Sequence, residues 1–300
     1  MTRKVFFEGS EVPDLMYYTN NPIFVINSSG HIVVGTPLGD YTNENNEVWV
    51  AVSHNYGNSF TEIQVCSTPF VTATYYYEVC VLEDSSGVFW LVAGYGRNTV
   101  PKSGKFVVYK STNQGNSWSY INEIVLAAGK KADYTRFHID GTDLYIGSTS
   151  EGKLYKSSDG GASFSAISDF SGASEGFLGV GANDGVICVA VFLANGVDAE
   201  IRRSTDGGAN YTVVKTMYVA DGYSGEVGQA SAKFRISGNV WVYITWSLLK
   251  DTIKRLYLIS YDNGLTWSER YADITRSENS WAVTYNGGSI SGEPQVWSLP

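Results

Sequence analysis

The chain has 300 residues, 43% of them hydrophobic and 14% aromatic, with 32 glycines and 7 prolines. This is ample for a large core and excludes a disordered chain. The formal charge of -9 and the scattered basic residues argue against a nucleic-acid partner. No apolar run reaches the roughly 18 residues of a membrane span, and residues 1–8 lack the apolar run of a secretory signal. We therefore expect neither membrane insertion nor export by the usual route.

A short pattern, S-x-[DN]-x-G-x-[STN]-aromatic, recurs five times along the chain. The copies, named box 1 to box 5, begin at Ser53, Ser111, Ser157, Ser204 and Ser260. They follow one another at about 46 to 58 residues, a period that suits one four-stranded propeller blade. Since propellers often reach this length as one domain, we expect residues 1–300 to form a single domain.

The residue types of each box are those of a tight turn. An Asp or Asn oxygen accepts backbone N–H groups, a glycine can take positive φ, and the final aromatic ring begins the return strand. The structural residues are therefore Ser53, Asn55, Gly57 and Phe60; Ser111, Asn113, Gly115 and Trp118; Ser157, Asp159, Gly161 and Phe164; Ser204, Asp206, Gly208 and Tyr211; and Ser260, Asp262, Gly264 and Trp267.

Strand-like runs surround the boxes at regular intervals. Those around box 3 are residues 134–139, 144–147, 153–156 and 165–168. Those around box 4 are residues 176–181, 186–192, 199–203 and 212–215. Short runs separated by turn residues predict antiparallel hairpins, and no stretch shows a capped helical period. The fold class is therefore all-β, a β-propeller of four-stranded antiparallel blades.

The two ends of the chain offer strands for a further blade. Residues 4–8 at the head, and residues 280–285 and 295–298 at the tail, have strand-like sequences. Pairing the N-terminal strand with C-terminal strands would close the ring and remove an open sheet edge. We therefore favour six blades, with five as the alternative.

The boxes resemble the Asp-box, or BNR, repeat of the sialidase-like β-propellers, over five of the six expected blades. The resemblance implies that each box lies on the turn between the third and fourth strands, away from the central funnel where that family binds substrate. The same repeat occurs in non-enzymatic propellers, so the resemblance specifies a fold more strongly than an activity.

A working sialidase should carry an Arg-Ile-Pro element on its first inner strand, further inner-strand arginines, an acid/base Asp, and a Tyr with a Glu as nucleophile pair. Here residues 22–26 read PIFVI, without an arginine. Residues 234–237 echo the element, and Arg136 lies on another inner strand. Arg136 and Arg235 can form part of an anion site or pair with carboxylates of neighbouring blades. If the protein is a glycosidase, its candidate catalytic residues are Arg136, Arg235 and Glu226.

Binding candidates come from long connections and inner strands. Long loops with Tyr, Arg and Asp on a rigid scaffold are typical of recognition surfaces. We expect such loops at residues 94–104 and 218–229, while His138 shares a strand face with Arg136. The binding candidates are Tyr95, Arg97, Arg136, His138, Asp221, Tyr223 and Arg235.

Other reactive residues lack a supporting context. The three histidines, His31, His54 and His138, have no metal-ligand spacing, and the three cysteines contain no C-x-x-C pair, so we expect neither a metal nor a cofactor. Residues 172–176 match G-x-S-x-G, but no helix follows, so a loop is the better interpretation.

These observations favour a non-catalytic binding or structural propeller whose loop face recognises a glycan or a protein surface, with a sialidase-like glycoside hydrolase as the alternative. A composition rich in Gly, Ser, Thr, Asn and Tyr without a secretion signal is typical of a bacteriophage virion component, such as a tail or receptor-binding protein. It would be made in the host cytoplasm and contact other virion subunits. An intracellular assembly factor would share these features.

Overall fold

The structure is a computed structural model of the whole chain. It describes residues 6–7, 10–11, 23–27, 29–38, 47–67, 74–97, 103–132, 135–171, 176–193, 198–218, 233–249 and 252–273. Strands and turns make up these segments, and none of them forms a helix long and apolar enough to span a bilayer.

Five four-stranded antiparallel sheets, named sheets 1 to 5 in chain order, carry the fold. Sheet 1 comprises β3 (Ile23–Ile26), β4 (Ile32–Leu38), β5 (Glu47–Ser53) and β6 (Thr61–Ser67). Sheet 2 comprises β7 (Thr74–Glu83), β8 (Phe89–Arg97), β9 (Ser103–Ser111) and β10 (Ser119–Val125). Sheet 3 comprises β11 (Thr135–Asp140), β12 (Asp143–Ser148), β13 (Lys153–Ser157) and β14 (Ser165–Asp169). Sheet 4 comprises β15 (Gly176–Asn183), β16 (Val186–Phe192), β17 (Ala199–Ser204) and β18 (Thr212–Met217). Sheet 5 comprises β19 (Lys233–Ser237), β20 (Val240–Leu249), β21 (Thr252–Ser260) and β22 (Ser268–Asp273).

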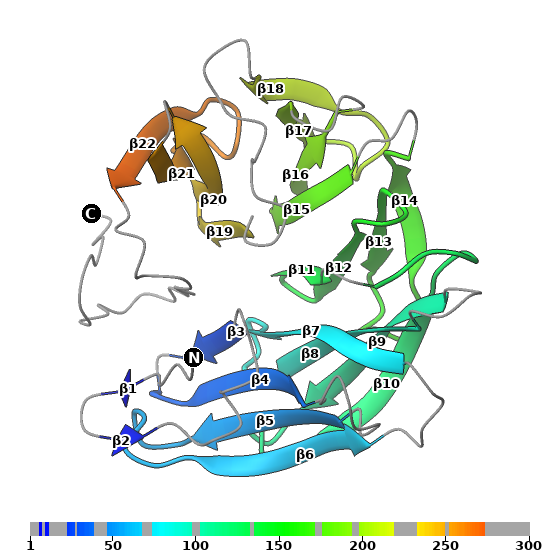
Figure 1. Cartoon of the computed structure of the whole chain (residues 1–300), viewed down its shortest axis with the longest axis vertical. Helices are drawn as coiled ribbons and strands as arrows, with labels where there is room; N and C mark the ends of the chain where they lie inside the picture. The colour runs from blue at the N-terminus through cyan, green and yellow to red at the C-terminus, as the bar shows by residue number, and fades with distance from the viewer. Residues whose placement is uncertain are drawn as a thin grey trace.

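Every sheet is a meander in which consecutive strands pair, and the first strand lies nearest the middle of the molecule (Figure 1). The inner strands contact one another in the order β3, β7, β11, β15 and β19. This arrangement is consistent with the predicted propeller, and the strands expected around boxes 3 and 4 are confirmed.

The hydrophobic core is divided among the spaces between neighbouring sheets. Four clusters of buried side chains lie between sheets 1 and 2, 2 and 3, 3 and 4, and 4 and 5. Successive residues of one strand enter different clusters: Leu91 packs toward sheet 1, and Trp90 packs toward sheet 3. Because side chains alternate across a strand, a sheet between two others is apolar on both faces. This explains the run Val186–Phe192, in which every residue is buried.

The boxes connect the third and fourth strands of all five sheets, and their hydrogen bonds are the same. The serine hydroxyl donates to the Asp or Asn Oδ1 at 2.7–3.0 Å. It also accepts the glycine N–H at 2.8–2.9 Å. The same Oδ1 accepts a further backbone N–H at 2.8–3.0 Å. The end of each sheet that carries its box is called the box face, and the opposite end is called the loop face.

The box glycines also lie against the preceding sheet. A Cβ on Gly264 would come within 2.6 Å of Cys188 Sγ in sheet 4, and one on Gly161 within 3.0 Å of Ile121 Cγ2 in sheet 2. Four of the final rings, Trp118, Phe164, Tyr211 and Trp267, pack against the inter-sheet clusters. Each box therefore closes its own hairpin, and boxes 2 to 5 also join their sheets to the ones before them.

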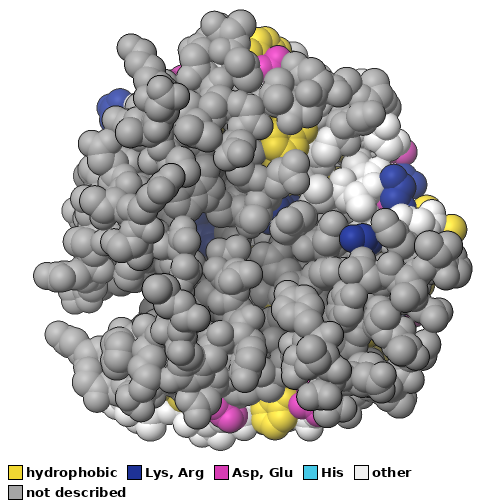
Figure 2. Space-filling view, viewed as in Figure 1, with side chains coloured by type: hydrophobic (Ala, Val, Ile, Leu, Met, Phe, Trp, Pro, Cys, Tyr) yellow, Lys and Arg dark blue, Asp and Glu magenta, His cyan; other side chains and the backbone are white. Residues whose placement is uncertain are grey.

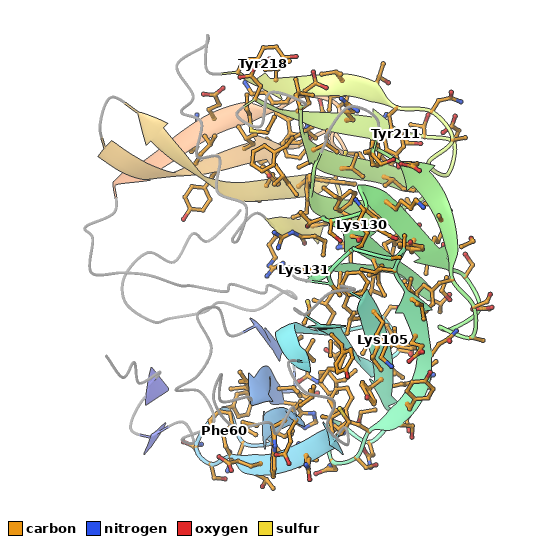
Figure 3. The ribbon with its side chains drawn as sticks, turned by 45° about the vertical axis from the view of Figure 1, so that its right-hand side comes forward. Phe60, Lys105, Lys130, Lys131, Tyr211 and Tyr218 are labelled. Atoms are coloured by element: carbon orange, nitrogen blue, oxygen red, sulfur yellow. The ribbon has the colours of Figure 1, made fainter. Side chains whose placement is uncertain are left out.

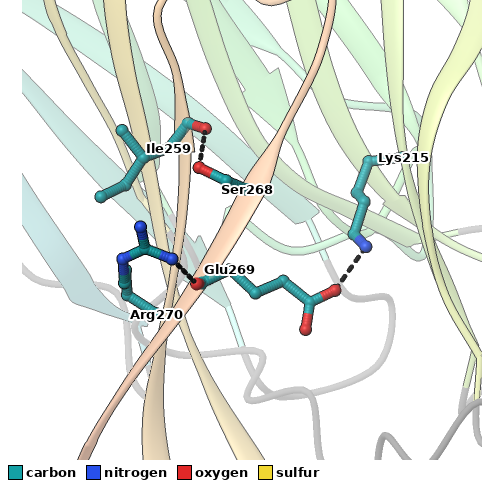
Figure 4. A network of polar contacts seen from close by, with 5 residues as sticks. All are labelled: Lys215, Ile259, Ser268, Glu269 and Arg270. Atoms are coloured by element: carbon teal, nitrogen blue, oxygen red, sulfur yellow. Dashed lines mark hydrogen bonds and ion pairs between the residues drawn. The ribbon is translucent and has the colours of Figure 1, made fainter.

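An ion pair joins sheets 4 and 5 near their outer strands. Lys215 Nζ lies 2.5 Å from Glu269 Oε1, while the Arg270 guanidinium donates to the Glu269 carbonyl (Figure 4). Both charged partners are partly exposed, so water screens the attraction and its contribution to stability is modest.

The two ends of the chain leave the six-blade prediction open. At the head, β1 (Phe6–Phe7) pairs with β2 (Ser10–Glu11). The tail strands predicted at residues 280–285 and 295–298 lie outside the described residues. The described residues therefore form five four-stranded sheets and the small β1–β2 sheet, and they do not test the closure of the ring.

The predicted loop at residues 94–104 is wrong in its extent. Residues 94–97 continue β8, and residues 103–104 already belong to β9. Tyr95 pairs with Lys105, and Arg97 pairs with Ser103. The glycines that suggested a loop, Gly94 and Gly96, are accommodated because the hairpin ladder continues through them.

Candidate functional site

The middle of the molecule is lined by inner strands, and β11 contributes two polar side chains there. Phe137 and Ile139 of this strand pack toward sheet 2. Arg136 and His138 therefore lie on the opposite face, toward sheet 4. Arg136 is buried, and His138 is half-buried, with its Nε2 2.8 Å from the Ala182 carbonyl oxygen.

Arg235 reaches the same region from β19. Its neighbours Phe234 and Ile236 lie against Gly181 of sheet 4, so Arg235 is on the other side of the strand. Its guanidinium interacts electrostatically with His138 of sheet 3 and with Cys80 of sheet 2. Sheets 2 and 3 lie across the middle of the molecule from sheet 5 (Figure 1), which indicates that Arg235 lies on the inner side of β19.

Burial sets the protonation of this group. It lowers the pKa of His138 to about 4, an effect that Arg235 reinforces and that Ala182 and Asp140 oppose. At neutral pH the imidazole is therefore uncharged and donates from Nε2 to the carbonyl. Burial also lowers the pKa of Arg235, but guanidinium stays protonated in proteins. Two arginines thus place positive charge in the middle of a chain whose net charge is -9.

In the space-filling view, dark blue atoms of basic side chains are recessed near the centre of the face (Figure 2). Two other inner strands, β3 (IFVI) and β15 (GFLGVGAN), carry no ionisable side chain. A guanidinium in partly desolvated surroundings binds carboxylate, sulfate or phosphate through paired N–H donors. The arrangement is suited to holding an anionic group.

The connection from sheet 2 to sheet 3 adds lysines on the loop face. Lys131 N–H donates to Ser150 Oγ at 3.1 Å, and this hydroxyl donates to the Lys131 carbonyl at 2.5 Å. The backbone of this connection is therefore anchored to the turn between β12 and β13. In Figure 3, Lys130 and Lys131 lie between Tyr211 and Lys105, with Tyr218 at the top of the view and Phe60 at the bottom.

Two Tyr–Glu pairs, which sequence reasoning missed, lie at the loop-face ends of sheets 3 and 4. Tyr218 donates to Glu200 Oε1 at 2.5 Å, and Arg202 Nε donates to the other oxygen at 2.8 Å. The hydrogen bond to Glu200 and, secondarily, burial raise the pKa of Tyr218 to about 12. Tyr155 likewise donates to Glu151, and burial, followed by this hydrogen bond, raises its pKa.

Both tyrosines therefore remain protonated, and both pairs belong to outer strands or turns rather than to the inner strands. They stabilise the loop face. Their partners are separated by only 18 and 4 residues, but nothing in the local sequence distinguishes them from other exposed Tyr and Glu.

The structure brings together only some of the predicted site residues. His138 and Arg235 interact electrostatically, and Arg136 lies on the same face of β11 as His138. Tyr95 belongs to a different cluster, in which Lys105 lies 5.3 Å above its ring and pairs with Glu123 at 2.6 Å. Arg97 ends β8. Asp221, Tyr223 and Glu226 lie outside the described residues.

The candidate metal ligands and the thiols are dispersed in the described part of the chain. It contains no group of three or more His, Cys, Asp or Glu placed to hold a metal ion. Cys66, Cys80 and Cys188 are free thiols, the latter two buried, and burial raises the pKa of Cys188 to about 12. A buried thiol with so high a pKa is unreactive.

Comparison with known proteins identifies solved structures with a similar fold. No protein-family model matches the chain, and no curated protein matches it. Among solved structures, a Dyadobacter fermentans protein of unknown function is 17% identical, with a TM-score of 0.55 over 84% of this chain and 82% of that one. A Hadza microbial sialidase is 14% identical, with a TM-score of 0.56 over 82% of this chain and 57% of that one.

A GH43 β-1,3-galactosidase is 11% identical, with a TM-score of 0.52 over 93% of this chain and 97% of that one. The chain thus spans little more than half of the sialidase and nearly all of the galactosidase. At these identities the likeness concerns the fold alone, and it supports a sialidase-like propeller.

Proposed function

We propose that this protein is a carbohydrate-binding propeller that holds an acidic glycan at its centre and does not cleave it. The observation that carries the proposal is the approach of Arg235, from sheet 5, to a neutral His138 of sheet 3, while Arg136 is buried on the same face of β11 as His138. Guanidinium groups recognise sugar carboxylates or sulfates, and desolvation strengthens that recognition. The glycan-acting proteins among its structural neighbours add support for a carbohydrate ligand.

The sequences of the inner strands support binding without hydrolysis. The first inner strand, β3, reads IFVI, so the arginine that a sialidase would place there is missing. The tyrosine hydroxyls of the two Tyr–Glu pairs stay protonated, which suits a structural hydrogen bond and not a nucleophile. Binding tolerates these features, whereas hydrolysis requires an activated nucleophile and a general acid.

A glycan array followed by titration tests this proposal. Wild-type protein should retain sialylated, uronate-containing or sulfated glycans, and Arg235→Gln should weaken binding by about tenfold or more, as expected for loss of a charge-assisted contact. The affinity of Arg235→Lys should lie between those of wild type and Arg235→Gln. Lysine keeps the positive charge but lacks the paired N–H donors of the guanidinium. The exposed Arg270, on outer strand β22, supplies the control variant Arg270→Gln. Equal binding by all four proteins would reject the site.

A glycoside hydrolase is the second candidate, favoured by the two inner-strand arginines themselves. Arg136 and Arg235 would then hold the substrate anion, and Glu226 would be the candidate carboxylate. Incubation with a fluorogenic sialoside and a panel of other glycosides distinguishes the two. Turnover that disappears in Arg235→Gln and in Glu226→Gln would establish hydrolysis.

We also propose that the protein is a virion component of a bacteriophage that uses its propeller to recognise a receptor glycan. The Gly-, Ser-, Thr-, Asn- and Tyr-rich composition motivates this proposal. Purified particles should contain the chain in a fixed ratio to other subunits, measured by mass spectrometry. A protein found only as a free monomer in the lysate, by mass photometry, would remove the virion role.

A further inference from the structure

Tyr56 of box 1 is the most exposed of the large hydrophobic side chains that the structure describes, with 71% of its surface accessible. It also has a φ of +59°. A side chain with a Cβ is disfavoured in this left-handed region, and for a bulky residue the conformation marks strain or function. An exposed ring on a disfavoured backbone gains little from burial, so folding alone does not explain it.

The other boxes show that the turn does not need this ring. The equivalent position holds Gln114, Gly160, Gly207 and Asn263, with φ values of +61°, +68°, +73° and +57°. These are small or polar residues, which the left-handed region tolerates better. Box 1 makes the same serine and Asn hydrogen bonds as the rest. The tyrosine is therefore an addition to a turn that forms without it.

The ring lies flat on the backbone of Gly30. A Cβ built on that glycine would meet Tyr56 Cε1, Cδ1 and Cζ at 2.3, 2.4 and 2.5 Å, and three nearly equal distances indicate the face of the ring. Tyr56 N–H also donates to the Gly30 carbonyl at 3.1 Å. One face is thus supported by backbone, and the high exposure leaves the other face open to solvent.

Polar groups adjoin this platform. His31 follows Gly30, His54 precedes Tyr56 by two residues, and their rings meet edge to face at 5.0 Å. His54 Nε2 lies 3.0 Å from Asn116 Oδ1 of box 2. The Asn27 amide lies 3.4 Å from His31 Nδ1 and donates to Glu83 at 3.0 Å. The cluster spans sheets 1 and 2 and holds the turn that carries Tyr56.

We infer that the open face of Tyr56 is a sugar-stacking subsite on the box face, and that its ligand is a neutral pyranose. A flat aromatic face packs on the apolar C–H face of a pyranose, while neighbouring imidazole and amide groups hydrogen-bond the hydroxyls. The charged group in this cluster is the Glu83 carboxylate, which accepts the hydrogen bond from Asn27 and would repel an acidic sugar. This subsite is separate from the arginine centre, because Tyr56 lies on a turn at the end of sheet 1, and it stands if that centre binds nothing.

Saturation-transfer NMR with the full chain and the methyl glycosides of glucose, galactose, mannose and N-acetylglucosamine tests the inference. The test variant, Tyr56→Asn, gives box 1 the residue that box 5 already uses at this position. The control variant, Tyr261→Asn, removes another tyrosine, 59% exposed, from box 5. At least one glycoside should show saturation of its ring protons with wild-type protein and with Tyr261→Asn, and lose about tenfold in affinity with Tyr56→Asn.

Thermal unfolding of the same proteins separates a ligand role from a structural one. Tyr56→Asn should melt at the wild-type temperature or above it, since asparagine is better suited to this φ. No saturation transfer from any of the four glycosides, equal transfer in Tyr56→Asn, or a clear fall in its melting temperature would overturn the inference. Saturation only of tetramethylammonium, included as a cationic probe, would assign the ring to cations instead.

Discussion

At the level of single residues, the serine that opens each box matters because it is buried. All five serines are at most 2% exposed, and the hydroxyl of each both donates and accepts a hydrogen bond within its box. A buried hydroxyl without partners would cost free energy. The Asp or Asn and the glycine N–H supply those partners, which explains why the three residue types recur together.

The box glycines are required for two separable reasons, and matched variants distinguish them. Gly264 and Gly185 both have a φ of +77°, but a Cβ would meet Cys188 Sγ at 2.6 Å only at Gly264, while nothing lies within 4 Å at Gly185. Gly185→Ala should cost about 1 kcal/mol of unfolding free energy through backbone strain. Gly264→Ala should cost about 2 kcal/mol more through overpacking.

Urea denaturation at neutral pH measures both values. Equal losses in the two alanine variants would show that box 5 does not press against sheet 4 as described.

The three box aspartates should make stability depend on acidity. Hydrogen bonds from Ser163 lower the pKa of Asp159 to about 2, and those from Asn210 do the same for Asp206. For Asp262, burial opposes the shift, and hydrogen bonds from Thr266 still lower the pKa to about 2. Since the unfolded value is near 3.8, this stabilisation is present above pH 4 and is lost as pH falls toward 2.

Asparagine in boxes 1 and 2 provides the uncharged version of the same turn. The triple variant Asp159→Asn, Asp206→Asn, Asp262→Asn should therefore fold and lose less stability than wild type between pH 4 and pH 2. Urea midpoints at pH 4, 3 and 2 measure the difference. Parallel curves for the two proteins would contradict the assigned role of the carboxylates.

At the level of elements, the sequence predicted the strands around boxes 3 and 4 because their apolar runs end at glycine-containing turns. The run 186–192 was predicted with the bounds that β16 has. The sequence did not predict the extension of β8 through Tyr95 and Arg97. The local glycines suggest a loop, and the strand continues there because it pairs with β9. The contact of His31 with His54 was equally hidden, because packing of two turns, not spacing, creates it.

The inner strand β11 should contribute its own pH dependence. The folded pKa of His138 is lowered to about 4 from 6.5, so the unfolded chain takes up a proton first as pH falls. Stability should decrease between about pH 6.5 and pH 4, by at most about 3 kcal/mol for a shift of this size. His138→Gln keeps a donor for the Ala182 carbonyl and should flatten this slope.

Unfolding free energies at pH 7, 6, 5 and 4 test the effect, with His54→Gln as the control because His54 is exposed. A slope that His138→Gln leaves unchanged would mean that the imidazole is not held neutral by its surroundings.

At the level of the whole molecule, one face of sheet 1 bears on the number of blades. Ile32, Val34 and Ala51 are at most 2% exposed and alternate with residues that pack on sheet 2, such as Val33. They therefore lie on the face that points away from sheet 2. The predicted sixth blade, formed by the head and tail, would cover that face and close the ring.

Truncation after Asp273 tests that prediction. Loss of residues 274–300 should lower the melting temperature by at least about 5 °C and increase the binding of a hydrophobic dye. A truncated chain with unchanged melting and no added dye binding would reject closure by the tail.

The arrangement of the sheets also explains why the site was only partly predictable. Arg136 and Arg235 were recognised as inner-strand residues, but His138 and Arg235 are 97 positions apart (235 − 138), and only the order of the sheets brings them near each other. The lowered pKa of His138 depends on burial, which no local pattern encodes.

Binding without cleavage at this centre is most directly tested by following one acidic glycan through both processes. The tightest ligand from the array is titrated against the protein by calorimetry, and the same mixture is then analysed by mass spectrometry after prolonged incubation. We predict saturable binding that Arg235→Gln weakens and a glycan recovered at its original mass. Cleavage by wild-type protein that Arg235→Gln abolishes would contradict the account.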